Sequence, residues 1–265
     1  RGWLQNIEED PVARAALKDH EWNQYRVVAS GDRIQTWING VPCADLIDSV
    51  NQGGFIGLQV HSFKGPHPAE VRWRNIRVQD LGRHVWQPLW DGKTLTGWSA
   101  IGGGDWTVED GVLHARASRS VKEHGLLISD DTFRDFTARL EYKVLKGNSG
   151  LYFRVERLED DPMGVAGFQA EIDVENDAGG LYESRGRAWV SQPDPADVAT
   201  YFKPGEWNRM TVSARGRRVV VHVNDVKSAD LRNDPGRLEG HLALQVHGNQ
   251  DVDVMFRNLE ILRLE

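Results

Sequence analysis

Apolar and polar residues alternate through most of this chain, which is the pattern of β-strands with one buried face. Gly, Asp and Asn separate the alternating runs, and no long helical pattern lies between them. The predicted strands are residues 106–115, 124–129, 136–145, 149–156, 167–175, 208–216, 218–225, 241–248 and 252–264. Only two short helices are predicted, at residues 11–18 and 195–199. The sequence therefore predicts an all-β sandwich or jelly roll.

The beginning of the chain resembles its end. Several segments match in the same order, which is hard to produce by chance and predicts an internal repeat. The matching pairs are RGWL at the N-terminus with RAWV (187–190), EWNQYRVVASGDRIQTWINGVPCADL from Glu21 with EWNRMTVSARGRRVVVHVNDVKSADL from Glu206, GFIGLQVH ending at His61 with GHLALQVH ending at His247, and VRWRNIRV around Asn75 with VMFRNLEI around Asn258.

The repeat predicts two domains of unequal completeness. Residues 85–265 form a complete sandwich domain, and residues 1–82 form the C-terminal portion of a first domain whose N-terminal half is absent from this chain. A sandwich without its first strands has unpaired edges and an uncovered core face. We therefore expect the missing half as a separate or further segment of polypeptide. The alternative is a degenerate half-domain that depends on the complete one.

Polar residues gather on one face of the predicted strand 167–175. The side chains of Phe168, Ala170, Ile172 and Val174 point toward the core, and the opposite face carries Gln169, Glu171, Asp173 and Glu175. Neighbouring carboxylates repel one another and raise at least one pKa, which is a condition that acid–base chemistry uses. The alternative interpretation is an ordinary solvated strand face.

Three other segments offer polar side chains to the same face. In SGLYFRVE, Leu151 and Phe153 point inward, whereas Tyr152 and Arg154 point outward, so Arg154 is the expected partner of Glu171 or Asp173. In HLALQVHG, Gln245 and His247 point outward, and Gln59 and His61 repeat them in the partial copy, although a shared structural role would produce the same recurrence. The segment GGLYESRGRAWV is read as a loop and adds four residues that frame a sugar: Tyr182, Glu183, Arg185 and Trp189. In the partial copy, Trp3 aligns with Trp189.

Composition excludes several classes of function. The net charge of −7, with 32 basic and 39 acidic residues, is not the basic footprint of a nucleic-acid-binding protein and gives no attraction to anionic membranes. No apolar run is long enough for a membrane helix, and no signal peptide is visible. The single cysteine, Cys43, cannot form an internal disulfide. The ten Trp residues suit both a packed core and aromatic surfaces for sugars.

As a set, the motifs resemble those of the 3-keto-disaccharide hydrolase family. They are LWDGKTLTGW (89–98), GNSGLYFR, GFQAEIDVE, GLYES, KPGEWN, and QVHG followed by FRNLEI. The resemblance covers the second domain and the C-terminal portion of the first. It implies a concanavalin-like, laminin-G-like jelly-roll sandwich, an oligosaccharide or glycoside as ligand, and a secreted or periplasmic location.

The resemblance also implies a reaction. A ketone at C3 of a glycoside acidifies the C2 hydrogen, and the resulting enolate expels the glycosidic oxygen at C1 before water adds. This route needs a base near C2, a donor for the enolate oxygen and an acid for the leaving group. The candidates are His247 or one carboxylate of Glu171 and Asp173 as base, with Arg154 and Tyr152 stabilising the oxyanion. The candidate substrate-binding residues are Tyr152, Gln169, Tyr182, Glu183, Arg185, Trp189 and Gln245.

Three alternatives stay open. A divalent metal held by His247 and the carboxylates would serve the same purpose, but no compact ligand motif indicates it. The pattern formed by Glu171, Asp173 and Glu175 is also that of retaining glucanases, whose two carboxyl groups lie about 5 Å apart. The third alternative is a module that binds glycans without catalysis, because a sandwich fold alone does not give a function.

Overall fold

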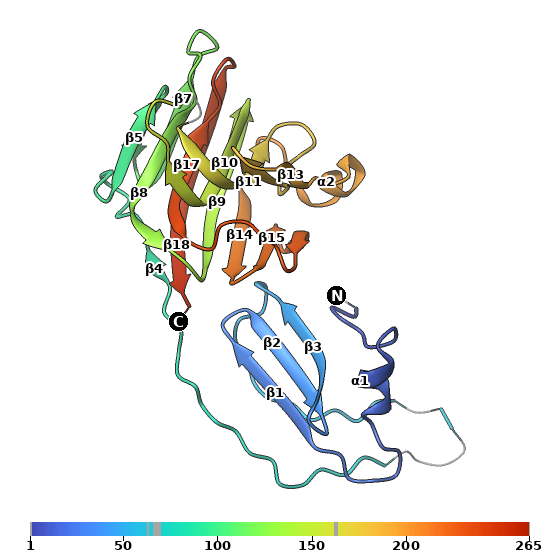
Figure 1. Ribbon diagram of the computed structural model, residues 1–265. Coiled ribbons are helices and arrows are strands. Elements are labelled where there is room, and N and C mark those ends of the chain that lie inside the picture. Colours follow the sequence, from blue (N-terminus) through green and yellow to red (C-terminus); the bar gives the residue numbers. More distant parts are fainter. Residues whose placement is uncertain (1, 63, 66–69, 162–163, 265) are drawn as a thin grey trace. The chain divides into compact units, whose positions relative to one another are not determined.

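The computed structural model describes residues 2–62, 64–65, 70–161 and 164–264, and it is all-β with antiparallel sheets (Figure 1). The predicted fold class is therefore confirmed. The chain divides into two compact units, residues 1–84 and 85–265. In the described part of the chain, no helix is both long enough and apolar enough to cross a membrane.

The second unit contains most of the strands and one helix. Its α2 (Pro195–Tyr201) is two residues longer than predicted and begins at the N-cap Asp194, whose side chain accepts a hydrogen bond from the backbone of Ala196. Its strands are β4 (Gln87–Pro88), β5 (Trp98–Gly102), β6 (Asp105–Glu109), β7 (Val112–Ala117), β8 (Gly125–Phe133), β9 (Phe136–Lys146), β10 (Asn148–Arg157), β11 (Val165–Asp173), β12 (Leu181–Ser184), β13 (Ala188–Ser191), β14 (Asn208–Arg215), β15 (Arg218–Val223), β16 (Val226–Leu231), β17 (Gly240–Val246) and β18 (Val252–Arg263).

These strands form two sheets that pack face to face. The seven-stranded sheet has the order β13-β12-β11-β10-β17-β8-β5. The eight-stranded sheet has the order β16-β15-β14-β9-β18-β7-β6, with β4 paired to β18. The late strands β17 and β18 lie in the middle of the two sheets, between strands from the first half of the unit (Figure 1).

The core lies between the two sheets and follows the predicted alternation. Phe168, Ala170 and Ile172 of β11 are buried in one apolar cluster, together with side chains from both sheets. The inward residues predicted for β10 and β17 are in the same cluster: Leu151, Phe153, Leu242, Leu244 and Val246.

A second, smaller apolar cluster covers part of the outer face of the seven-stranded sheet. Its buried members are Leu126, Ile128, Tyr152, Val155, Val165 and Ala243. A Cβ placed on Gly164 would lie 3.0 Å from Ile101 and 3.3 Å from Leu126, so the turn between β10 and β11 comes back onto this cluster. The apolar cluster leaves the neighbouring part of the same face to polar side chains.

The first unit contains α1 (Pro11–Ala15), shorter than predicted, and a three-stranded antiparallel sheet of β1 (Tyr25–Ser30), β2 (Arg33–Ile38) and β3 (Val41–Ile47). The described residues from 51 to 86 lie in neither helix nor strand. Many apolar side chains of this segment are exposed, including Phe55 at 97%.

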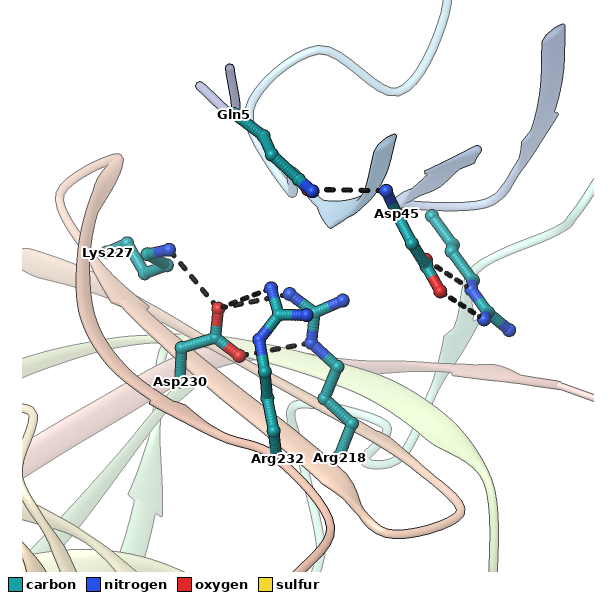
Figure 2. A network of polar contacts seen from close by, with 7 residues as sticks. Gln5, Asp45, Arg218, Lys227, Asp230 and Arg232 are labelled. Atoms are coloured by element: carbon teal, nitrogen blue, oxygen red, sulfur yellow. Dashed lines mark hydrogen bonds and ion pairs between the residues drawn. The ribbon is translucent and has the colours of Figure 1, made fainter. Parts of the chain in front are cut away.

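The β2–β3 hairpin and the β15–β16 hairpin carry ion pairs at aligned positions. Arg33 binds Asp45 in the first unit, with 2.6 Å between Nη2 and Oδ2. Arg218 binds Asp230 in the second, where Lys227 and Arg232 also contact the carboxylate (Figure 2). Burial acts to raise the pKa of Asp230, but Arg218 and then Lys227 outweigh it and hold this pKa below its usual value. In the first unit the side chain of Gln5 accepts a hydrogen bond from the backbone nitrogen of Asp45.

Candidate functional site

The polar part of the outer face of the seven-stranded sheet is centred on Gly150 of β10. Glu171 of β11 and Gln245 of β17 are the cross-strand neighbours of Gly150, one on each side. A Cβ on Gly150 would lie 2.5 Å from Nε2 of Gln169, so the absence of a side chain allows the Gln169 amide to lie across this position. The sheet register therefore brings these polar residues together as predicted.

Two glutamines and a tyrosine form a buried hydrogen-bond network at this centre. The Nε2 of Gln169 donates to the backbone oxygen of Ser149 and to Oε1 of Gln245, both at 3.2 Å. The Nε2 of Gln245 donates to the Tyr152 hydroxyl at 3.2 Å, and that hydroxyl also lies 3.0 Å from Oγ of Ser184. Because these groups satisfy one another, the network stabilises one arrangement of the face.

Glu171 is buried, with 4% of its surface exposed. The side-chain amide of Asn148 donates to its Oε1 at 2.5 Å. Burial, followed by repulsion from Asp173, raises the pKa of Glu171 to about 8, so the carboxyl is mostly protonated at neutral pH. Burial raises the pKa of Asp173 as well, against hydrogen bonds from the backbone of Asp177 and Glu175. The pKa is thus raised in both carboxyls, but burial is the main cause, and the repulsion that the sequence predicted is the smaller contribution.

Two histidines lie at the end of the sheet where Asn148 lies, His124 directly before β8 and His247 directly after β17. The backbone nitrogen of His247 donates to the backbone oxygen of Asn148 at 3.1 Å, and the His247 ring meets the His124 ring edge-on at 4.3 Å between centroids. His247 is half-buried, and its Nδ1 lies 2.7 Å from the backbone oxygen of Gly248. A carbonyl oxygen only accepts, so Nδ1 carries the proton and Nε2 holds a free lone pair in the neutral ring.

His124 has the opposite tautomer. Its Nδ1 accepts from the backbone nitrogen of Gly248 and from Nε2 of Gln245, both at 3.3 Å. The proton of the neutral ring is therefore on Nε2. Burial, followed by the neighbouring His247, lowers the pKa of His124 to about 4, so His124 stays neutral at pH 7. Sequence reasoning missed His124 and Asn148, because His124 is brought here by the pairing of β8 with β17 across a long stretch of chain.

An aromatic pair stands at one side of the polar face. The segment predicted as a loop is a hairpin of β12 and β13, and its register places Tyr182 opposite Trp189. Their rings meet edge-on at 5.4 Å between centroids, and both are partly exposed. Tyr182 is also the cross-strand neighbour of Gln169. Partly exposed aromatic rings beside buried amides suit the apolar face and hydroxyl groups of a sugar.

The expected pairing of Arg154 with Glu171 or Asp173 is wrong. A β-bulge after Phe153 interrupts the alternation, and Arg154 takes a left-handed backbone conformation with φ of 51°. The bulge turns its side chain elsewhere, where it is 1% exposed and donates to the backbone oxygens of Arg134, Gly216 and Arg237 and to Asp135. This geometry is that of a buried structural arginine.

Two further predicted residues are engaged away from Glu171. Glu183 is the cross-strand neighbour of the core residue Phe168, and its carboxylate binds Arg187, which also binds Asp234. Arg185 forms an ion pair with Asp161, at 2.8 Å. Neither contact brings a charged group to the polar face.

The retaining-glucanase pattern does not lie on one strand. Strand β11 ends at Asp173, and Glu175 follows in an exposed bend. Within the described ranges, no three His, Cys, Asp or Glu side chains come close enough together to hold a metal ion. A cavity of about 340 Å³ lies elsewhere, beside Trp207 and Arg257 of the second unit, rather than at this face.

A comparison with known protein families matches residues 2–79 and 85–262 to one family, described as the 3-keto-alpha-glucoside-1,2-lyase-like domain. The chain belongs to this family. The resemblance read from the motifs is thereby confirmed, and it places the protein among carbohydrate-related domains. No curated protein matches the chain.

Solved structures resemble the chain in fold. A proposed glycosyl hydrolase from Parabacteroides distasonis ATCC 8503 is 21% identical, with a TM-score of 0.51, and the match covers 68% of this chain and 94% of that one. A protein of unknown function with a galectin-like fold from Bacillus subtilis is 16% identical, with a TM-score of 0.51, covering 68% and 96%. The carbohydrate-binding module CBM66 from Bacillus subtilis is 20% identical, with a TM-score of 0.49, covering 63% and 96%. The first two likenesses show the sandwich fold of this family member.

Proposed function

We propose that this family member cleaves 3-keto-glycosides by removing the C2 proton and expelling the C1 glycosidic oxygen. The observation that supports it is the junction at Asn148. Its side chain binds Glu171, and its backbone oxygen binds the backbone of His247. A protonated carboxyl and the His247 imidazole therefore lie at one end of the polar face, on the sheet that also carries a partly exposed aromatic pair.

His247 is the proposed base. Its Nδ1 proton is held by the Gly248 oxygen, so Nε2 is the nitrogen that can accept a proton. The ketone at C3 acidifies the C2 hydrogen, and transfer of this proton to Nε2 leaves an enolate. His124 packs edge-on against the ring and restricts its rotation, and we infer that it positions His247.

Glu171 is the proposed acid. With its pKa raised to about 8 it holds a proton at neutral pH. When the C1–O bond breaks, the leaving oxygen takes this proton and departs as an alcohol, and the sugar becomes an enone with a C1–C2 double bond. Addition of water to that double bond gives the 3-keto sugar, so the net reaction is hydrolysis. Tyr182 and Trp189 would hold the sugar ring beside these groups.

The decisive experiment is incubation of the chain with a 3-keto glucoside and, separately, with the unoxidised parent, following enone and reducing-sugar release. We expect release from the keto sugar only. Glu171→Gln and His247→Ala should each lower turnover at least ~100-fold. His241→Ala is the matched control, because His241 lies near the start of β17, the strand that His247 follows, and its Nδ1 binds the Ser129 backbone oxygen outside the site.

Each other outcome has a distinct meaning. Near-wild-type rates in both site variants remove His247 and Glu171 from the reaction. Release from the unoxidised parent alone favours a glucanase.

A glycan-binding module without catalysis is the second candidate. The observation in its favour is that the polar side chains of the face are almost inaccessible: Gln169 is 4%, Gln245 is 1% and Glu171 is 4% exposed. The two glutamines bind each other, and Glu171 binds Asn148. Tyr182 and Trp189, in contrast, are partly exposed. Saturable binding of a glycoside, abolished by Trp189→Ala and without any product, would favour the glycan-binding module.

Export to the periplasm or the cell exterior stays a prediction.

A further inference from the structure

The first unit exposes apolar side chains at positions where the second unit buries them. In β1, Tyr25 is 59% and Val27 is 52% exposed, whereas the aligned Met210 and Val212 of β14 are both at 0%. Single exposed apolar residues are ordinary on protein surfaces, but a matched series along several segments is not.

The segment 54–61 continues the series. Its Ile56, Leu58 and Val60 are 71%, 52% and 71% exposed. The aligned residues of β17 are at 0%, 1% and 0%: Leu242, Leu244 and Val246.

The segment 71–78 behaves in the same way. Its Val71, Trp73, Ile76 and Val78 are 50%, 48%, 59% and 69% exposed. The aligned residues of β18 are at 0%, 0%, 4% and 0%: Val254, Phe256, Leu259 and Ile261.

Where the first unit is folded, its local structure is that of the second. Asn39 donates to Asn23 and to the backbone oxygen of Ala16, each at 2.7 Å. The aligned Asn224 donates to Asn208 and to the backbone oxygen of Tyr201, also at 2.7 Å. In each unit an arginine lies over the aligned tryptophan: Arg74 over Trp22 at 3.9 Å, and Arg257 over Trp207 at 4.0 Å. The exposed apolar residues therefore do not reflect a different fold.

The second unit shows what covers these faces. Strand β17 pairs with β10 and β8, β18 pairs with β9 and β7, and β14 pairs with β9. All of these partners come from residues 112–157. Segments 54–61 and 71–78 have the sequence of central strands, and a central strand needs a neighbour on each side to satisfy its backbone and bury its side chains.

We propose that the first unit is an acceptor for a polypeptide equivalent to residues 85–186. This polypeptide supplies counterparts of β7, β8, β9 and β10. Segments 54–61 and 71–78 then become the central strands of two sheets, and β1 gains the partner that β14 has in β9. The strands of a second copy are not the occupant, because its own β7–β10 already pair within its second unit.

The test extends the full chain at its N-terminus with a copy of residues 85–186, so that Gly186 of the copy leads directly into the first unit, as it leads into Arg187 in the second. Hydrogen exchange followed by mass spectrometry reports on segments 54–61 and 71–78. In the unextended chain we expect their amides to exchange almost without protection. In the extended chain we expect exchange at least ~100-fold slower, because the hydrogen bonds between these segments and the added strands must open before the amides exchange.

A matched extension carries Leu140→Asp and Phe153→Asp within the copy, at two core positions of β9 and β10. It should give no protection in the two segments. Protection at β17 and β18 in every chain shows that the second unit is folded. Equal exchange with both extensions overturns the proposal. Concentration-dependent protection in the unextended chain also overturns it, because a second copy would then cover these faces.

Discussion

At the scale of single residues, Glu171 combines two opposing influences. Burial disfavours its ionised form, and the hydrogen bond from Asn148 favours that form, with burial dominating. A carboxyl whose pKa is higher in the folded than in the unfolded protein stabilises the fold fully at low pH. This stabilisation declines as the pH rises from the unfolded value, about 4.3, and is lost above the folded value.

The unfolding free energy should therefore fall between pH 5 and pH 9 through Glu171. With a folded pKa of about 8, the loss across this window is roughly 4 kcal/mol, at about 1.4 kcal/mol for each pH unit between the two pKa values. Glu171→Gln should remove this component. Urea unfolding of both proteins at pH 5, 7 and 9 measures it. Parallel pH profiles for the two proteins would show that Glu171 is ionised in the folded state at neutral pH.

At the scale of elements, the turn between β15 and β16 depends on one asparagine. Asn224 has φ of 47°, which few residues other than Gly, Asn and Asp adopt readily. Its side chain donates to Tyr201 and Asn208 and accepts from the backbone nitrogen of Arg209 at 2.9 Å. The turn thereby ties α2, β14 and β15 together, and Asn39 does the same for α1, β1 and β2.

Asn224→Ala should lower the unfolding free energy by about 3 kcal/mol, because it removes three hydrogen bonds and leaves Ala in a left-handed conformation. Asn258→Ala is the control. Asn258 has φ of 53° and is exposed, and among the described residues its side chain makes no hydrogen bond. The control should cost about 1 kcal/mol, from the backbone alone. Equal losses in denaturant titrations of the two variants would mean that the hydrogen bonds add nothing.

At the scale of the whole molecule, the two compact units differ in how completely their strands are paired. Both sheets of the sandwich and every residue of the proposed site come from residues 85–265. The first unit has counterparts of two candidate site residues: His61 aligns with His247 and Trp3 with Trp189. The Nδ1 of His61 lies 2.8 Å from the Ser62 oxygen, and Trp3 is 87% exposed. Residues 1–84 have no counterpart of Glu171.

A chain of residues 85–265 should therefore fold alone and retain full turnover of a 3-keto glucoside. Its thermal midpoint should equal that of the sandwich transition in the full chain, since the sandwich has its own core. Calorimetry and the enone assay on both chains test this. A lower midpoint or a large loss of turnover in the shorter chain would mean that residues 1–84 support the sandwich.

Period-two alternation was enough to assign the core and the polar face of β11 and β17, because an uninterrupted strand turns successive side chains to opposite faces. Phe168, Leu244, Glu171 and Gln245 lie where the alternation predicts. The motifs were likewise enough to identify the family.

Only the tertiary structure decided the rest. One extra residue in a bulge reverses the direction of Arg154, and such a bulge leaves no mark on the local pattern. His124 and Asn148 join the site through strand pairings between distant segments, and the burial that sets the pKa of Glu171 exists only once those strands have met. Alternation is a property of neighbouring residues, whereas register and burial are properties of the assembled sheets.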